Sequence, residues 1–162
     1  MLIILDDVLS TDDMYRMRTY FGDNPENRRY NWANGNFDQV IQYDSPLVKL
    51  VAIANKHINV KHLCGIEFWA HLGTKPDWHI DRDEKLALTT NEIKHPICSI
   101  VYYAHVENLI GGRFMTETEL VVPRDNRMVI FSPGILHTVE DYEGTRLSVA
   151  VNPWEHIPLE YV

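Results

Sequence analysis

Apolar positions in the first third of the chain follow the spacing of helices. A short apolar run at residues 2–5 predicts a strand, and Ser10 with its acidic following turn then marks a helix start. Gly22 ends that helix, and the polar, turn-rich residues 23–36 predict a loop. A second helix begins at Pro46, and its apolar residues share one face: Leu47, Leu50, Val51, Ala54 and Ile58.

After residue 63 the pattern changes to short strands separated by turn residues. We expect strands near residues 64–71, 77–81, 97–104, 112–115, 118–122, 127–131, 137–140 and 145–151. So many short strands indicate antiparallel pairing in a barrel or a double-sheet jelly roll. The 82–96 stretch is long for a connection between two strands, and loops of that length are often functional or mobile.

These patterns predict one mainly β domain over residues 1–162. Residues 63–154 would form the core of a double-stranded β-helix (jelly roll), and residues 1–62 would provide two N-terminal helices packed on the larger sheet. A chain of this length can bury a substantial core without disulfides. Its composition, 45 % hydrophobic and 23 % charged, is that of an ordinary globular domain.

Charge and cysteine content narrow the possible partners. The net charge of -8 at pH 7 makes nucleic acid an unfavoured partner, because phosphate backbones attract basic surfaces. No apolar run reaches the roughly 20 residues that cross a bilayer, so we expect no membrane insertion. The chain has two cysteines, Cys64 and Cys98, which are too few for a disulfide framework. We interpret them as reduced thiols, which favours a cytoplasmic location. The sequence does not indicate an oligomeric state.

The triplet His79-Ile80-Asp81 is the main candidate for chemistry. Alternate residues of a strand face the same side, so the imidazole and the carboxylate would project together as ligands for a divalent first-row metal. A surface strand with two polar residues is the plain alternative, and His105-Val106-Glu107 has the same form. The first triplet is favoured because His137 follows at the start of a predicted strand, with Arg146 on the next one.

Two histidines and one carboxylate favour a particular kind of metal chemistry. Such a triad covers one face of an octahedral ion and leaves three positions open, as in non-haem Fe(II) oxygenases, whereas zinc more often takes four tetrahedral ligands. Three open positions suit a bidentate 2-oxo acid and O2. A buried Arg146 would then pair the far carboxylate of that acid, although it could instead form a structural ion pair with Glu140 or Glu143.

The stretch from Trp78 to Trp154 resembles the Fe(II)/2-oxoglutarate-dependent dioxygenases, and within them the prolyl 4-hydroxylase-like branch. The matching pieces stand in the family's order: His79-Ile80-Asp81, Ile100–Tyr103, Gly111-Gly112, Arg127–Ser132, His137–Val139 and Thr145–Val149. The resemblance implies that His79, Asp81 and His137 hold Fe(II). It also implies that 2-oxoglutarate and O2 are cosubstrates and that Arg146 pairs the distal carboxylate of 2-oxoglutarate.

The resemblance assigns two further residues to the cosubstrate. It implies that Tyr103 donates its hydroxyl to the distal carboxylate and that Ser148, two residues beyond Arg146, contacts it as well. The plain alternatives are a core tyrosine and a satisfied strand hydroxyl. The sequence departs from the branch in two places. Trp69 stands where the branch often has a tyrosine, which concerns the lining of the pocket, and the 82–96 loop is longer than in close relatives, which concerns the substrate.

The activity implied is hydroxylation of an unactivated C–H bond with release of succinate and CO2. By resemblance the substrate would be a peptidyl proline, while a free amino acid or another small molecule stays open, and the 82–96 and 23–36 loops would grip it. The alternative is a cupin-like metal-binding protein or isomerase on the same fold, without 2-oxoglutarate turnover. A nucleic-acid demethylase of the same superfamily is disfavoured by the acidic net charge.

Overall fold

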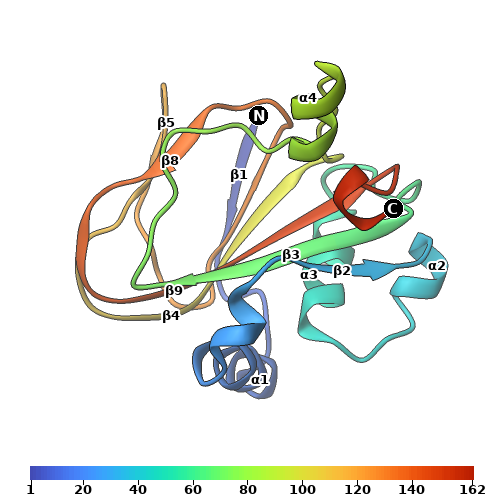
Figure 1. The fold of residues 1–162 in the computed structure, drawn as a ribbon. Helices are drawn as coiled ribbons and strands as arrows, with labels where there is room; N and C mark the ends of the chain where they lie inside the picture. Colours follow the sequence, from blue (N-terminus) through green and yellow to red (C-terminus); the bar gives the residue numbers. More distant parts are fainter.

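A six-stranded antiparallel sheet forms the centre of the computed structural model, which describes residues 1–162 (Figure 1). Its spatial order is β1-β7-β4-β9-β3-β2. The strands are β1 (Leu2–Leu5), β7 (Met128–Phe131), β4 (Ser99–Gly111), β9 (Tyr142–Trp154), β3 (Gly65–Leu72) and β2 (Asn31–Asn34). The two long strands β4 and β9 pair with each other, and this pairing sets the position of most of the site.

A smaller sheet faces the large one. It contains β6 (Leu120–Val121), β5 (Phe114–Thr116) and β8 (His137–Val139), in the order β6-β5-β8. The rest of the predicted 77–81 strand is unpaired, and only His79 forms a bridge, with His137 of β8. Two facing antiparallel sheets are the predicted double-stranded β-helix.

Two N-terminal helices cover the outer face of the large sheet, as predicted (Figure 1). Helix α1 (Thr11–Gly22) begins where the Ser10 side chain accepts a hydrogen bond from the Asp13 backbone N–H, and α3 (Pro46–Ala54) begins at Pro46. The second helix is shorter than expected, because the chain turns at Asn55 before Ile58. None of the helices combines the length and the apolar content needed to cross a membrane.

The alternation of side chains along the strands divides the interior into two layers. Along β9, Leu147, Val149 and Val151 pack under the helices. The intervening residues Arg146, Ser148 and Ala150 point between the sheets, where they line a cavity. The smaller core cluster between the sheets consists of Tyr103, Phe114, Val121, Val129 and Phe131.

Two predicted loops contain secondary structure. The 23–36 segment holds a 3-10 helix, η1 (Pro25–Arg28), and the edge strand β2, and a short helix, α2 (Phe37–Val40), follows it. The polar sequence of β2 gives no strand signal, because its pairing with β3 supplies the order. The 82–96 segment holds α4 (Glu84–Thr90), which packs against the C-terminal 3-10 helix η2 (Leu159–Tyr161).

The cap of α4 explains why that helix was not predicted. The Asp83 carboxylate accepts a hydrogen bond from the Leu86 backbone N–H, and its other oxygen accepts one from the Leu159 N–H at 2.9 Å. Asp83 is buried, although it stands within a charged run that reads as a solvated loop. Contacts with the distant C-terminal segment, which local sequence does not show, therefore hold the helix in place.

Candidate metal centre

The three predicted metal ligands meet at one point between the sheets. The ligand atoms of His79, Asp81 and His137 all lie within 4.8 Å of one another. Asp81 Oδ1 is 3.4 Å from His79 Nε2 and 3.8 Å from His137 Nε2, so the same carboxylate oxygen faces both rings. The bridge between His79 and His137 brings the two histidine backbones side by side, which explains how residues 58 positions apart in the sequence converge.

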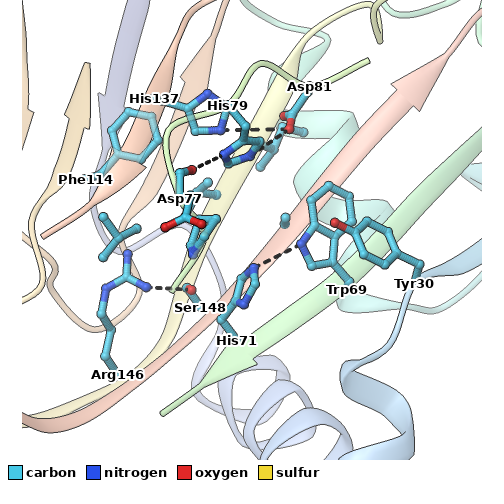
Figure 2. Close-up of a pocket in the computed structure, with 15 residues that line it drawn as sticks. Tyr30, Trp69, His71, Asp77, His79, Asp81, Phe114, His137, Arg146 and Ser148 are labelled. Carbon is cyan, nitrogen blue, oxygen red and sulfur yellow. Dashed lines mark hydrogen bonds and ion pairs between the residues drawn. The ribbon is translucent and has the colours of Figure 1, made fainter. Parts of the chain in front are cut away.

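Backbone carbonyls hold both imidazoles in the orientation that a metal site needs. His79 Nδ1 lies 2.7 Å from the Asp77 carbonyl oxygen, and His137 Nδ1 lies 2.8 Å from the Ile135 carbonyl oxygen. Each Nδ1 is therefore protonated and donates, so a neutral ring directs the lone pair of its Nε2 at the centre (Figure 2). In the metal-free site a protonated His79 would instead donate from Nε2 to Asp81. The Ser99 hydroxyl donates to Asp81 Oδ2 at 2.5 Å and leaves Oδ1 for an ion.

The charge states of the three groups follow from their surroundings. Burial lowers the pKa of His137, which favours the neutral ring that binds metals. The hydrogen bond and charge of Asp81 raise the pKa of His79 in the metal-free site. Burial opposes ionisation of Asp81, but hydrogen bonds from His79 and Ser99 and the charge of His137 hold its pKa below the ordinary value.

Arg146 lies at the far end of a cavity of about 220 Å³ that begins at the metal ligands (Figure 2). Its side chain is only 1 % exposed. The guanidinium donates from Nε to the Gly112 carbonyl and from Nη1 to Ser148 Oγ, both at 2.9 Å. No carboxylate lies within 4.0 Å of it: Glu140 pairs with Arg113, and Glu143 is exposed. Arg146 is therefore not the structural ion-pair partner that the alternative required.

A buried guanidinium without a negative partner is a strong sign of a missing anion. Leaving a charge buried and unpaired is destabilising by several kcal/mol, so proteins rarely do so without a ligand. Gly112 is fitted to this group: its φ is +74°, and a Cβ there would lie 3.1 Å from the Arg146 Cδ. The predicted Gly111-Gly112 pair thus keeps space for the arginine and offers it a carbonyl.

Tyr103 and Ser148 take different positions relative to the cavity. Ser148 lines it and binds Arg146 directly. Tyr103 is fully buried in the core cluster between the sheets, with the Arg146 Cζ 5.1 Å from its ring centroid, and it does not line the cavity. Its hydroxyl has no hydrogen-bond partner. The predicted contacts of both side chains with a cosubstrate stay predictions.

The opposite wall contains Trp69, which the sequence analysis connected with the pocket lining, together with Tyr30 and His71, which it did not assign. Tyr30 stacks on Trp69 with ring centroids 4.5 Å apart, and both line the cavity. Trp69 Nε1 donates to His71 Nε2 at 3.3 Å. Burial, together with the charges of Arg146 and His79, lowers the pKa of His71 to about 4, so this ring is neutral. Tyr30 comes from the segment before β2, where the predicted loop carried no motif that could have identified it.

The competing triplet does not form a comparable centre. His105 Nε2 lies 3.8 Å from a Glu107 oxygen, but this carboxylate is mostly exposed. The cluster of His79, Asp81 and His137 is the one group of metal-ligating side chains that meets at a single point in residues 1–162. None of the other histidines joins the cluster, although His71 lies in the cavity wall and His95 Nδ1 lies 2.7 Å from the Asp81 carbonyl oxygen.

Comparison with known proteins gives no match by sequence and several by structure. No protein-family model matches the chain, and no curated protein matches it. A Pseudomonas putida prolyl-4-hydroxylase structure superposes with a TM-score of 0.65 at 17 % identity, over 96 % of this chain and 85 % of that one. The 2OG complex of a viral collagen prolyl hydroxylase from Paramecium Bursaria Chlorella virus-1 gives 0.63 at 12 %, over 94 % and 95 %.

A third structure extends the comparison to an enzyme with a peptide. It is a prolyl hydroxylase from Trichoplax adhaerens in complex with a hypoxia inducible factor peptide fragment, with a TM-score of 0.57 at 11 % identity over 95 % of this chain and 83 % of that one. This chain has the fold of the 2OG-Fe(II) oxygenases. The predicted fold is thereby confirmed, and what the chain does with it must be argued from its own residues.

Proposed function

We propose that the protein is an Fe(II)- and 2-oxoglutarate-dependent dioxygenase that hydroxylates an unactivated C–H bond. The observation that carries this proposal is the buried Arg146, which has no carboxylate partner and lies across one small cavity from two histidines and a carboxylate. A ligand that binds a metal at one end and carries an anion at the other fits that cavity. 2-Oxoglutarate has this form.

The residues present fit Fe(II) in ligand type and number. His79, Asp81 and His137 would supply one face of an octahedral ion and leave three positions open. When bound, Fe(II) and 2-oxoglutarate would supply, with O2, the oxidant for the substrate C–H bond and release succinate and CO2. Thiolates, which favour zinc and copper(I), are absent from the cluster, since neither of the two cysteines, Cys64 and Cys98, belongs to it.

Each neighbouring side chain has a role that follows from its contacts. The Asp77 and Ile135 carbonyls fix the two imidazoles, and Ser99 fixes Asp81. The free Nη2 of Arg146 and the second hydrogen-bonding capacity of the Ser148 hydroxyl would hold the distal carboxylate of 2-oxoglutarate. Apolar side chains such as Ile100, Phe114 and Val139 line the space between and would keep water out.

The substrate is proposed only as a small molecule or a peptide. A prolyl hydroxylase-like activity is supported by the prolyl hydroxylases among the structural neighbours and by the order of the motifs. The segments expected to grip it carry α4 and β2, whose surroundings include Tyr30 and the second cavity described below. The cupin-like alternative has no explanation for an arginine buried without a carboxylate partner.

The test is an anaerobic titration of Fe(II)-loaded protein with 2-oxoglutarate, followed by visible absorption. We expect the weak charge-transfer band that chelation of Fe(II) by a 2-oxo acid produces. The band should disappear in His79→Ala, which loses a ligand, and should require much more 2-oxoglutarate in Arg146→Ala. Iron binding without any band would refute the proposal and favour the cupin-like alternative.

A further inference from the structure

A second cavity adjoins the metal ligands on the side away from Arg146. Its volume is about 440 Å³, twice that of the first cavity, and it is within the usual range for small-molecule sites. The two cavities share four wall residues: Tyr30, Trp69, His79 and Asp81. A molecule in the second cavity would therefore lie beside the metal centre without occupying the space that leads to Arg146.

The second cavity has a negative lining, in contrast to the first. Beyond the metal ligand Asp81, four carboxylates line it, from Glu67, Asp83, Glu84 and Glu160. Two cations line it as well: Arg82 is paired with Glu84 at 2.7 Å, and Lys85 is exposed and has no ion pair. A dianion such as 2-oxoglutarate is therefore repelled here and attracted to the Arg146 end. We call this space the acidic cavity.

Glu67 is the most informative of these carboxylates. Its two oxygens accept hydrogen bonds from the Tyr161 hydroxyl at 2.8 Å and from Trp154 Nε1 at 3.2 Å, so both partners are neutral. No cation lies within 4.0 Å of it. Burial raises its pKa, which reflects the cost of keeping an unneutralised charge there. A carboxylate has about four acceptor sites, so capacity for a further donor remains.

Asn152 supplies an independent sign of a ligand. It lies directly opposite Glu67 in the β3–β9 register and lines the acidic cavity. Its side chain is 1 % exposed, and its Oδ1 has no hydrogen-bond partner. A buried acceptor without a donor costs about 1–3 kcal/mol. Glu67, which has acceptor capacity to spare, and Asn152, whose oxygen lacks a donor, thus lie side by side in the wall of the acidic cavity.

The remaining walls suit a cation. Tyr30, Trp69, Trp154 and Tyr161 contribute aromatic rings to the acidic cavity. The negative face of an aromatic ring attracts cations, and such contacts are strongest where water is excluded. A primary ammonium group has three N–H donors and a positive charge, which match an amide oxygen, a carboxylate and aromatic walls together.

We propose that the acidic cavity binds a protonated amine of the substrate and so presents a neighbouring C–H bond to the metal centre. Glu67 and Asn152 would receive the ammonium group. The chemistry of the bound molecule rests on the proposed function, but its binding does not. The substrate class is therefore an amine, such as a free amino acid or a basic side chain, in preference to a neutral peptidyl proline.

Binding can be measured without turnover by loading the protein with Zn(II) and 2-oxoglutarate. Isothermal titration with the free L-amino acids should identify at least one that binds. Its N-acetylated counterpart, whose nitrogen cannot be protonated, should bind at least tenfold more weakly. A blocked tripeptide with a central proline and no basic group is the neutral probe, and we expect it to bind more weakly than the amine.

Variants locate the effect in the acidic cavity. Glu67→Gln keeps the shape of the side chain and removes its charge, and Asn152→Leu removes the acceptor and keeps the same branching; each should weaken the amine at least tenfold. The matched control is Glu143→Gln, an exposed glutamate without hydrogen bonds, which should bind like the parent. Thermal unfolding of each variant confirms that it is folded, and the loss in Glu67→Gln alone suffices if Asn152→Leu does not fold.

Three results would overturn the assignment: no amine binds, the neutral proline peptide binds as tightly as the amine, or both variants keep the parent affinity. Failure of the proposed function appears separately. If the Fe(II) titration gives no charge-transfer band while amines still bind to the protein, with or without Zn(II), the dioxygenase proposal fails and the amine site stands. If the band forms and no amine binds, the dioxygenase stands and the amine site fails.

Discussion

Two buried residues, one on each side of the metal ligands, indicate what this site can bind. Arg146 has a charge without a counter-charge, and the Asn152 oxygen has no donor. The sequence predicted Arg146, because it stands at a fixed interval after His137 in a recognisable motif. It could not predict Asn152 or Glu67, because their meaning comes from cross-strand pairing and from the absence of partners around them.

A substitution at Gly112 tests whether the space at this residue is needed to position Arg146 in the first cavity. Gly112→Ala would place a Cβ 3.1 Å from the Arg146 Cδ and about as close to Tyr142 Cβ, at a φ of +74°. We expect roughly 1–2 kcal/mol of destabilisation from the backbone conformation and, because the guanidinium is displaced, about tenfold weaker 2-oxoglutarate binding. Calorimetric titration of the Zn(II)-loaded protein measures the affinity.

Gly73→Ala is the matched control, because Gly73 has a φ of +73° but nothing within 4 Å of the added Cβ. It should lose similar stability and keep the parent affinity for 2-oxoglutarate. Equal affinity in both variants would mean that the space at residue 112 does not position Arg146.

At the scale of elements, the sequence predicted the helices and strands whose own residues determine them, and it missed those that distant segments hold in place. The apolar spacing of α1 and α3 was visible because each helix buries one face, and the apolar runs of β4, β7 and β9 were visible because much of each strand is buried on both faces. β2 and α4 were not, since distant segments hold them: β3 pairs with the first, and Leu159 binds the Asp83 cap of the second. The predicted 77–81 strand is a single bridge, because only His79 there reaches β8.

The contact between α1 and α3 should make stability depend on pH. Asp13 on α1 is buried and accepts a hydrogen bond from Lys49 Nζ of α3 at 2.6 Å, and Arg16 Nη1 lies 3.1 Å away. Burial opposes ionisation, but these partners and Ser10 outweigh it and lower the pKa of Asp13. The native carboxylate therefore holds its proton less tightly than the unfolded one, and its contribution to stability is present above the unfolded pKa of about 3.8.

That contribution should be lost as the pH falls through the lowered native pKa. At pH 6 we expect Asp13→Asn to unfold with about 1–2 kcal/mol less free energy than the parent, a moderate figure because both cations are half-exposed. By pH 3 the difference should shrink. Urea denaturation at both pH values measures it, with the exposed Asp12→Asn as control. A difference that stays constant with pH would argue against the ion pairs as its source.

At the scale of the whole molecule, the fold brings together what the sequence separates. The metal ligands come from the segment before α4 and from β8, and the arginine comes from the middle of β9, so only the facing of the two sheets forms the site. The sequence predicted this assembly because strand number and motif order are properties of the whole chain. Because both sheets contribute residues to the site, a ligand bound there contacts both of them. Binding should therefore raise the stability of the entire domain.

We therefore expect 2-oxoglutarate to raise the melting temperature of the Zn(II)-loaded protein. At a concentration about 100 times the dissociation constant, a ligand that binds only the folded state contributes about 2.7 kcal/mol, or roughly 5–10 °C for a domain of this size. Arg146→Lys retains a positive charge but loses the fork that reaches both Ser148 and a carboxylate, so its affinity should fall about 10- to 100-fold. At the same concentration only about 0.4–1.4 kcal/mol then remains.

Two controls separate pairing at Arg146 from general effects of the ligand. Arg113→Lys alters an arginine that is paired with Glu140 at the protein surface, and it should keep the full rise in melting temperature. 2-Oxobutyrate retains the metal-chelating end of 2-oxoglutarate and lacks the distal carboxylate, so it should stabilise the parent protein only slightly. If it stabilised the parent as much as 2-oxoglutarate does, the buried guanidinium would have no role in holding the cosubstrate, because the only group that distinguishes the two ligands is the one that Arg146 is proposed to bind.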